Sequence, residues 1–159
     1  MKTQVIRYHD ISCGHRVAGH ESKCQHLHGH NYRIHFTCEA DELDQIGRVI
    51  DFGVVKARLC MWIEDNWDHK FLAWEHDPIM TRIKDLVTIW DQPIRSETNG
   101  PAAKTLNESL VWLPFNPTAE NMAQYLLDVV GPVQLEGTGV RLTAVRIEET
   151  AKCHVEVQK

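Results

Sequence analysis

Histidines are concentrated in one part of this 159-residue sequence: six of the ten lie between residues 15 and 35. Within that stretch, His28 and His30 are two residues apart, so in an extended segment their side chains leave the same face of the strand. The same alternation continues into an apolar set: Tyr32, Ile34, Phe36 and Cys38. A buried imidazole costs free energy unless it is hydrogen-bonded or bound to a metal ion. Although a single histidine is more often structural, this same-face pair predicts a metal site.

A third nitrogen ligand can come from His15, which ends an earlier run of β-forming residues. If residues 16–27 join two neighbouring antiparallel strands, His15 lies alongside His28 and His30. Three histidines that leave a fourth position open to water or substrate are a usual ligand set of catalytic zinc. The sequence thus predicts Zn²⁺ held by His15, His28 and His30. The other histidines of the stretch are expected to have ordinary structural or surface roles: His20, His26 and His35.

Cys24 lies in the same polar stretch, four residues before His28. A thiol beside a divalent cation and a positive side chain such as Lys23 is readily deprotonated and can act as a base or nucleophile. A cysteine is more often structural or a fourth metal ligand, and both alternatives stay open. The five cysteines are odd in number and include no C-x-x-C pair, and the N-terminus lacks an apolar leader. A disulfide framework is therefore not expected, and a cytoplasmic location is.

Two further acidic groups add candidate chemistry. Asp68 and His69 are adjacent, and an aspartate can fix the tautomer of a histidine that moves protons near neutral pH. A plain helix-end role also explains this pair. Glu149 shares strand parity with Val145 and Ile147, which places it on the apolar face. There its carboxylate can pair with adjacent N–H donors of a ring such as a pterin or guanine, although an acidic residue of a hairpin turn fits equally well.

Two pairs of strands frame the sequence. Alternating or β-rich runs cover residues 3–15 and 32–39 in the N-terminal part, and residues 140–149 and 152–158 in the C-terminal part. Two amphipathic helices lie between the pairs. This order predicts an α+β domain whose helices pack on one face of an antiparallel sheet.

Both helices carry boundary signals. Asp51 is the expected N-cap of the first, which ends near Asn66. The second has Thr118 as N-cap and Glu120 at its positive end, and is expected to end at Gly131-Pro132. Its predicted buried positions are Met122, Leu126, Val129 and Val130.

Residues 73–113 fit this order poorly and are interpreted as an insertion in a single domain spanning residues 1–159. A helix capped by Asp77 is expected from Pro78 to Trp90. A turn-rich stretch with Asn99-Gly100-Pro101 follows it.

Charge and hydropathy exclude two kinds of partner. A net charge of −5 argues against broad electrostatic capture of nucleic acid, which needs a basic face. No apolar run approaches the ~20 residues that a membrane span requires.

Taken in order, these motifs resemble those of the 6-pyruvoyl-tetrahydropterin and 6-carboxy-tetrahydropterin synthases. The string Cys24-x-x-x-His28-Gly29-His30-Asn31-Tyr32 is the most specific part of the resemblance. The other parts are His15, Ile50-Asp51-Phe52, Asp68-His69, Pro117-Thr118-Ala119-Glu120-Asn121 and Glu149-Thr150. The resemblance spans nearly the whole chain apart from residues 73–113.

The resemblance implies a tunnelling fold, or T-fold, in which a four-stranded antiparallel sheet carries two helices on one face, here with the inserted segment. It also implies trimers that stack into a hexamer, with active sites between subunits.

The resemblance further implies a substrate, 7,8-dihydroneopterin triphosphate, whose side-chain hydroxyls bind the zinc. By motif position, Cys24 is the proton-abstracting thiolate, and Asp68 and His69 form the relay that assists it. Glu149 is the anchor of the pterin ring. Further candidate substrate contacts are Thr118 and Glu120, and for the triphosphate Arg16, Lys23 and Lys70.

Two products are known for such a family. We favour 6-carboxy-5,6,7,8-tetrahydropterin, because the compact motif set looks bacterial or phage-like. A lyase forms this product with loss of triphosphate and acetaldehyde, on the way to 7-deazaguanine compounds such as queuosine. The alternative is 6-pyruvoyl-tetrahydropterin in a biopterin-type pathway. Two further alternatives are a zinc hydrolase and a zinc-containing pterin-binding protein without turnover. The hydrolase would not need Cys24, and the binding protein would not need the acid–base residues Cys24, Asp68 and His69.

Overall fold

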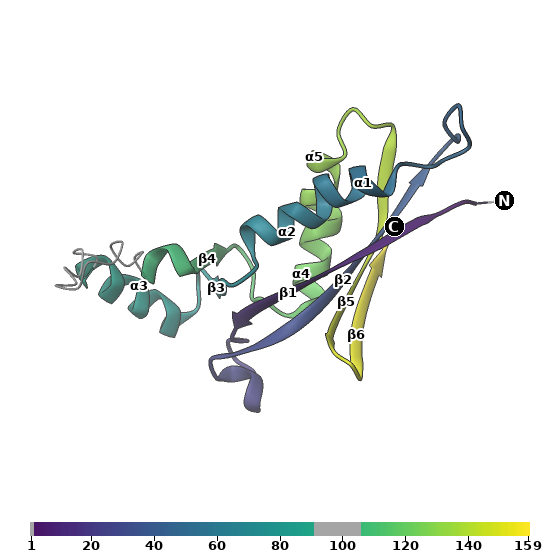
Figure 1. Cartoon of the computed structure of the whole chain (residues 1–159). Helices are drawn as coiled ribbons and strands as arrows, with labels where there is room; N and C mark the ends of the chain where they lie inside the picture. The colour runs from purple at the N-terminus through teal and green to yellow at the C-terminus, as the bar shows by residue number, and fades with distance from the viewer. Residues whose placement is uncertain (1, 91–105) are drawn as a thin grey trace, which may run out of the picture.

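The structure, a computed structural model, describes residues 2–90 and 106–159. Its centre is a curled mixed sheet of six strands in the order β4-β3-β1-β2-β5-β6 (Figure 1). The strands are β1 (Val5–His15), β2 (His28–Ala40), β3 (Phe71–Trp74), β4 (Leu110–Leu113), β5 (Val140–Thr150) and β6 (Cys153–Gln158). The helices are α1 (Phe52–Val55), α2 (Met61–Asn66), α3 (Pro78–Trp90), α4 (Ala119–Tyr125) and α5 (Gly131–Gln134). The α+β class predicted from the sequence is confirmed.

Strands β1 and β2 form the long hairpin from which the site is built. They pair in antiparallel register from Val5 opposite Cys38 to His15 opposite His28. Burial alternates along β2 as expected, and its fully buried side chains are Tyr32, Ile34, Phe36 and Cys38. The face that carries these residues is therefore the core face of the sheet.

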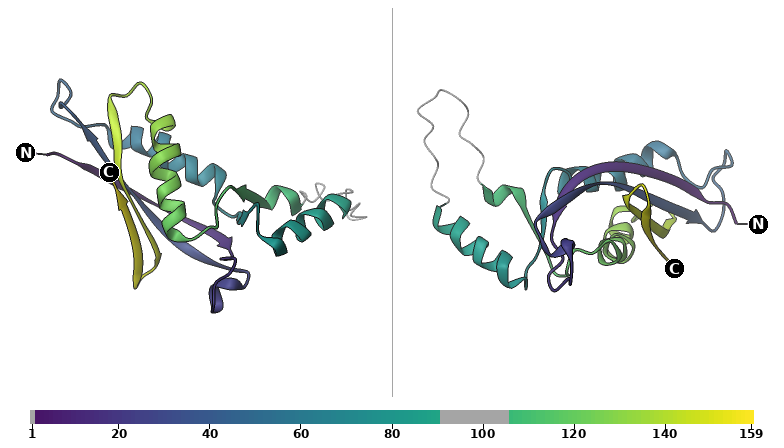
Figure 2. Two further views of the ribbon diagram at one scale, coloured as in Figure 1. Left: turned by 180° about the vertical axis from the view of Figure 1, so that it is seen from behind. Right: turned by 90° about the horizontal axis from the view of Figure 1, so that it is seen from below.

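Two longer helical segments cover that core face. α1 and α2 are joined by a π-type turn (Lys56–Cys60), and α4 and α5 by another (Leu126–Val130). Side chains on the core face of β1 reach the first segment: His9 Nε2 lies 2.7 Å from a Glu64 carboxylate oxygen. α4 and the turn after it pack against β5 and β6, and residues from both segments and the sheet form one apolar core (Figure 2).

The prediction of a four-stranded, all-antiparallel sheet is wrong. β3 runs parallel to the end of β1, with Gly14 opposite Phe71 and His15 opposite Leu72, and β4 runs parallel to β3. Each added strand has only four residues, too few for the alternation that marks a strand in the sequence. The segment interpreted as an insertion therefore starts and finishes inside the sheet.

Between β3 and β4, α3 projects away from the body of the sheet (Figure 1). Its predicted cap is confirmed, since Asp77 Oδ1 accepts from the backbone N–H of Ile79 at 2.9 Å. The turn-rich stretch with Asn99-Gly100-Pro101 lies outside the described residues.

The caps of the other two helical segments are also confirmed. Asp51 Oδ1 accepts from the N–H of Gly53, and Thr118 Oγ1 from the N–H of Asn121. The predicted end at Gly131-Pro132 is wrong, because the helix continues through α5, with the proline directly after the π-type turn.

The prediction of the buried face is wrong at one residue of this helix. Val129, predicted to be buried, is 46% exposed, whereas Leu127 is 1% exposed. The buried positions keep a regular helical period through Leu126, Leu127 and Val130, so Val129 lies at the edge of the buried face. Among the described residues, no helix is long and apolar enough to cross a membrane.

Candidate metal centre and catalytic site

The ends of β1 and β2 bring three imidazoles together. His15 is the last residue of β1 and lies opposite His28, the first residue of β2, while His30 follows two residues later on the same face. The ring centroid of His15 lies 4.5 Å from that of His28 and 5.3 Å from that of His30. One nitrogen from each ring lies within 4.8 Å of the other two. The hairpin register thus gathers the three predicted ligands at one point.

Hydrogen bonds on the far side of two rings determine which nitrogen is free. Nδ1 of His15 lies 2.7 Å from the carbonyl oxygen of Pro117, and Nδ1 of His28 lies 2.7 Å from that of His26. A carbonyl oxygen only accepts, so each Nδ1 carries the proton and each Nε2 presents a lone pair. These two Nε2 atoms are 3.1 Å apart. A histidine that donates its second N–H to a backbone carbonyl is the usual arrangement of a metal ligand.

The third ring, that of His30, leaves its Nε2 atom without a hydrogen-bond partner among the described residues. Nε2 of His30 is buried and makes no hydrogen bond within the described part of the chain. Burial lowers the pKa of His30 and of His15, although nearby Glu149 acts in the opposite direction on both. Neutral imidazoles with lone pairs that converge on one point repel each other unless a cation lies between them. The donor set therefore fits a metal ion, and three imidazole nitrogens suit Zn²⁺.

Tyr32 lies beside these rings, a position that the sequence indicated only through its strand parity with His28 and His30. Its hydroxyl oxygen is 3.2 Å from Nε2 of His15. Burial raises the pKa of Tyr32, so the phenol stays protonated at neutral pH. Tyr32 thus packs against the histidine cluster, although sequence reasoning placed it only in the core.

Gly29 separates the two ligands of β2 and faces Gly14 across the hairpin. A Cβ at this position would lie 2.8 Å from the carbonyl oxygen of Cys13, which is closer than atoms pack. Gly29→Ala is expected to push the strand ends apart, to lower the free energy of unfolding by about 1–3 kcal/mol and to weaken zinc binding. Thermal unfolding and a zinc titration would measure both effects. Unchanged stability and zinc affinity would show that the strand ends do not need this close approach.

A cavity of about 460 Å³ opens at one edge of the histidine cluster, where His15, but not His28 or His30, is part of its lining. Its lining comes from the loop after β1, the start of α4 and the ends of β5 and β6. The predicted site residues that line it are His15, Cys24, Thr118, Glu120 and Glu149. Glu149 is at the same time close to the third ring, with its carboxylate 3.4 Å from His30 Nε2. Sequence reasoning did not single out three other polar lining residues: His20, Cys153 and His154.

The reactivity of the cysteines follows from their positions. Burial raises the pKa of Cys13 and of Cys38 to about 12 in each case, so both remain thiols at neutral pH. Cys24, in contrast, is half-buried and faces the cavity. Its backbone is held, because its carbonyl oxygen accepts from the N–H of Val17 at 2.8 Å. Among these three thiols, Cys24 is the one placed to meet a bound molecule.

The Asp68–His69 pair does not line this cavity. The backbone N–H of Ser12 donates to Asp68 Oδ1 at 2.8 Å, and that of His69 donates to the Ser12 carbonyl at 2.7 Å. His69 lines two other hollows, one of them together with Asp68 and the other together with His30. Within one chain, the predicted relay therefore lies outside the cavity that Cys24 faces.

The pair is nevertheless well ordered. Nδ1 of His69 lies 2.5 Å from Asp68 Oδ2, and the backbone of His69 is left-handed, with φ 55°. Although partial burial acts in the opposite direction, hydrogen bonds from Ser12 and His69 hold the pKa of Asp68 below its usual value. The imidazole is 82% exposed. Asp68 thus orients a histidine whose other nitrogen faces outward.

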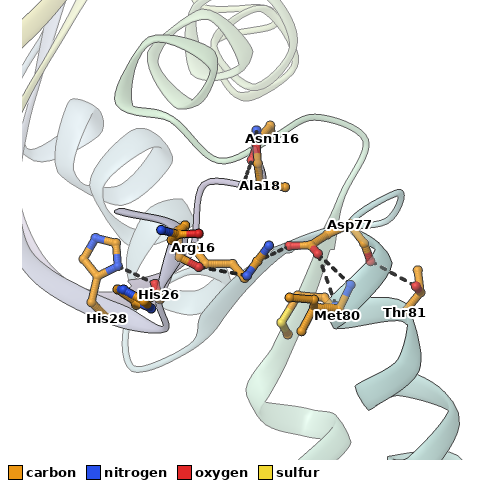
Figure 3. A network of polar contacts seen from close by, with 10 residues as sticks. Arg16, Ala18, His26, His28, Asp77, Met80, Thr81 and Asn116 are labelled. Carbon is orange, nitrogen blue, oxygen red and sulfur yellow. Dashed lines mark hydrogen bonds and ion pairs between the residues drawn. The ribbon is translucent and has the colours of Figure 1, made fainter. Parts of the chain in front are cut away.

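Two of the basic residues considered for an anionic substrate are engaged within the chain. Arg16 contacts Asp77 and the carbonyl of Gln25 (Figure 3). Lys70 donates to the carbonyl of Glu108 at 2.8 Å, and Lys23 is exposed on the loop. The Arg16 side chain therefore stabilises the conformation of the loop.

Comparison with known sequences agrees with these motifs. The family model described as 6-pyruvoyl tetrahydropterin synthase matches residues 4–159. The 6-carboxy-5,6,7,8-tetrahydropterin synthase of Rickettsia bellii is 34% identical over 148 residues, which cover 93% of this chain and 94% of that protein. The protein of the same name from Haemophilus influenzae is 27% identical, with 98% of this chain and 99% of that protein covered.

Solved structures show the same fold. The crystal structure of an uncharacterized protein from Wolinella succinogenes matches with a TM-score of 0.81 and 26% identity, and covers 100% of this chain and 99% of that chain. The 6-pyruvoyl tetrahydropterin synthase of Plasmodium vivax matches with a TM-score of 0.65 and 16% identity, covering 100% of this chain and 98% of that chain. With the matched family model and the relatives at this identity, the chain belongs to the 6-pyruvoyl tetrahydropterin synthase family.

Proposed function

We propose that this protein is a zinc-dependent lyase that converts 7,8-dihydroneopterin triphosphate to 6-carboxy-5,6,7,8-tetrahydropterin, with release of triphosphate and acetaldehyde. The observation that carries the proposal is the convergence of three imidazoles beside a cavity that also presents Cys24 and Glu149. The names of the relatives from Rickettsia bellii and Haemophilus influenzae support the carboxy product.

The roles of the side chains follow from their positions in the cavity. Glu149 offers carboxylate oxygens to adjacent N–H groups of the pterin ring, a paired and charge-assisted contact. Cys24 removes a proton from the substrate side chain as a thiolate base. Thr118 and Glu120, at the start of α4, are proposed as further substrate contacts. Zn²⁺ held by His15, His28 and His30 would supply Lewis-acid polarisation of the side-chain hydroxyls.

The proton relay requires a second copy of the chain. Asp68 and His69 do not line the cavity that Cys24 faces, and the His69 ring is exposed. We therefore propose that Asp68 and His69 of the partner subunit complete each site, in trimers that stack into a hexamer. A stable monomer that retains full turnover, as seen by light scattering, would contradict this arrangement. A cytoplasmic location is also proposed and suits a chain whose five cysteines are free thiols.

Product analysis tests the proposed reaction. Incubation of the zinc-loaded protein with 7,8-dihydroneopterin triphosphate, followed by chromatography, is expected to yield 6-carboxy-tetrahydropterin and acetaldehyde. Loss of substrate without acetaldehyde would indicate the 6-pyruvoyl product instead. Binding of the pterin without loss of triphosphate would indicate a binding protein without turnover.

A second candidate, a zinc hydrolase acting on a nucleotide-like ring, would use the same three histidines. It gives no role to the cavity-facing thiol of Cys24. Full activity in a Cys24→Ala variant would favour hydrolysis.

A further inference from the structure

Two side chains hold the loop that carries Cys24: Asn116 binds its first part at Ala18, and Arg16 binds its return. Arg16 follows directly after His15 at the start of the loop, and its side chain is 11% exposed. Its Nε donates to Asp77 Oδ2 at 2.5 Å, and its Nη1 donates to the carbonyl oxygen of Gln25 at 2.8 Å. Figure 3 shows Arg16 reaching Asp77, and the same guanidinium therefore ties Gln25, the residue after Cys24, to the segment between β3 and α3.

Asp77 gives this contact a fixed anchor. The carboxylate is fully buried, and its other oxygen caps α3 by accepting from the N–H of Ile79. The backbone N–H of Asp77 donates to the carbonyl of Trp74, the last residue of β3, at 3.0 Å. Because β3 pairs with the end of β1, the carboxylate is fixed relative to the strand that ends at His15.

The return of the loop is held at two consecutive carbonyls. The N–H of Val17 donates to the carbonyl of Cys24, and the side chain of Arg16 donates to that of Gln25. Only the second contact depends on a side chain. Removing the charge of Asp77 would take away the ion pair that holds the Arg16 guanidinium in place. The hydrogen bond from Arg16 to the Gln25 carbonyl would then lose its fixed donor.

We infer that Asp77 is a positioning residue for the reaction: through Arg16 it fixes the loop that presents Cys24, and it makes the position of that thiol depend on the α3 segment. This inference rests on the proposed role of Cys24. Asp77 itself touches neither the cavity nor the three histidines among the contacts of the structure. Its effect should therefore fall on the chemical step more than on substrate binding.

Asp77→Asn is the direct test, since asparagine also caps helices but lacks the charge that holds Arg16. We expect kcat to fall about 10- to 100-fold with KM changed less than about threefold, as for a misplaced catalytic group. Hydrogen–deuterium exchange of residues 16–26 should become faster, and zinc content should stay at the parental value. The matched control is Asp51→Asn, which removes the charge of another helix-capping aspartate with an arginine partner, Arg48. That variant should keep the parental kcat and loop exchange.

Arg16→Lys is a second variant if Asp77→Asn does not fold. A lysine ammonium lacks the planar fork that reaches both partners, so kcat and loop exchange should change in the same direction. Parental kcat and loop exchange in the variant that folds would overturn the inference. A fall in kcat caused by loss of zinc would also overturn it, because Asp77 would then act on the metal ligands. The proposed function is tested separately, by turnover of the parent protein and its loss in Cys24→Ala. Hydrogen–deuterium exchange of the loop can be measured without turnover, so it tests the role of Asp77 even if the proposed function is wrong.

Discussion

Replacement of Cys24 by alanine is expected to lower kcat by about 10²- to 10⁴-fold, the usual contribution of a positioned general base. The thiol faces the cavity beside the three histidines, whereas burial keeps Cys13 and Cys38 protonated. Zinc content and KM should remain close to the parental values, because no proposed ligand or ring contact is removed. Steady-state kinetics on 7,8-dihydroneopterin triphosphate and metal analysis would measure these quantities.

The control for this variant is Cys38→Ala. Cys38 is fully buried in β2, away from the cavity, so its replacement should lower stability but leave kcat per folded chain unchanged. If Cys24→Ala kept the parental kcat, the thiolate-base mechanism would be wrong.

Replacement of His28 by alanine is expected to remove zinc and turnover together. Loss of a residue that only hydrogen-bonds to a metal ligand costs about 10- to 100-fold in metal affinity, and loss of the ligand itself should cost more. Treatment of the parent with a chelator should abolish turnover in the same way, and added zinc should restore it in the parent only. Metal analysis after dialysis, with activity on the same samples, provides the measurement.

His9→Ala is the control for the loss of a histidine. His9 lies on the same core face of β1 but pairs with Glu64 and is not in the cluster. It should retain zinc at the parental stoichiometry. A His28→Ala variant with parental zinc content and turnover would show that these imidazoles are not the metal ligands.

The histidine cluster could be predicted from the sequence because its main signal is local. The period of two along a strand places His28 and His30 on one face without knowledge of any other segment. His15 required one further step, the pairing of two strands joined by the loop, and the register His15 opposite His28 confirms that step.

The position of the Asp68–His69 pair could not be predicted in this way. It depends on backbone contacts with Ser12 and on a left-handed residue, His69, which lacks the glycine that usually marks this conformation. The short parallel strands β3 and β4 were missed for a related reason, since four residues carry no measurable period. Long-range pairing and local backbone exceptions are the features that a single sequence reveals least.

The helices also combine features that nearby residues predict with features that they do not. The caps at Asp51, Asp77 and Thr118 are short-range signals, and all three appear in the structure. The exposure of Val129 shows instead how closely two apolar stripes can compete, because Leu126, Leu127, Val129 and Val130 are all apolar. The helical period alone does not indicate which stripe faces the sheet.

Zinc analysis combined with incubation on 7,8-dihydroneopterin triphosphate tests the central claim most directly. The protein is expected to hold one zinc ion per chain, bound by His15, His28 and His30, and to release triphosphate only when that zinc is present. Absence of zinc from the active protein, or a full complement of zinc without loss of substrate, would contradict the claim.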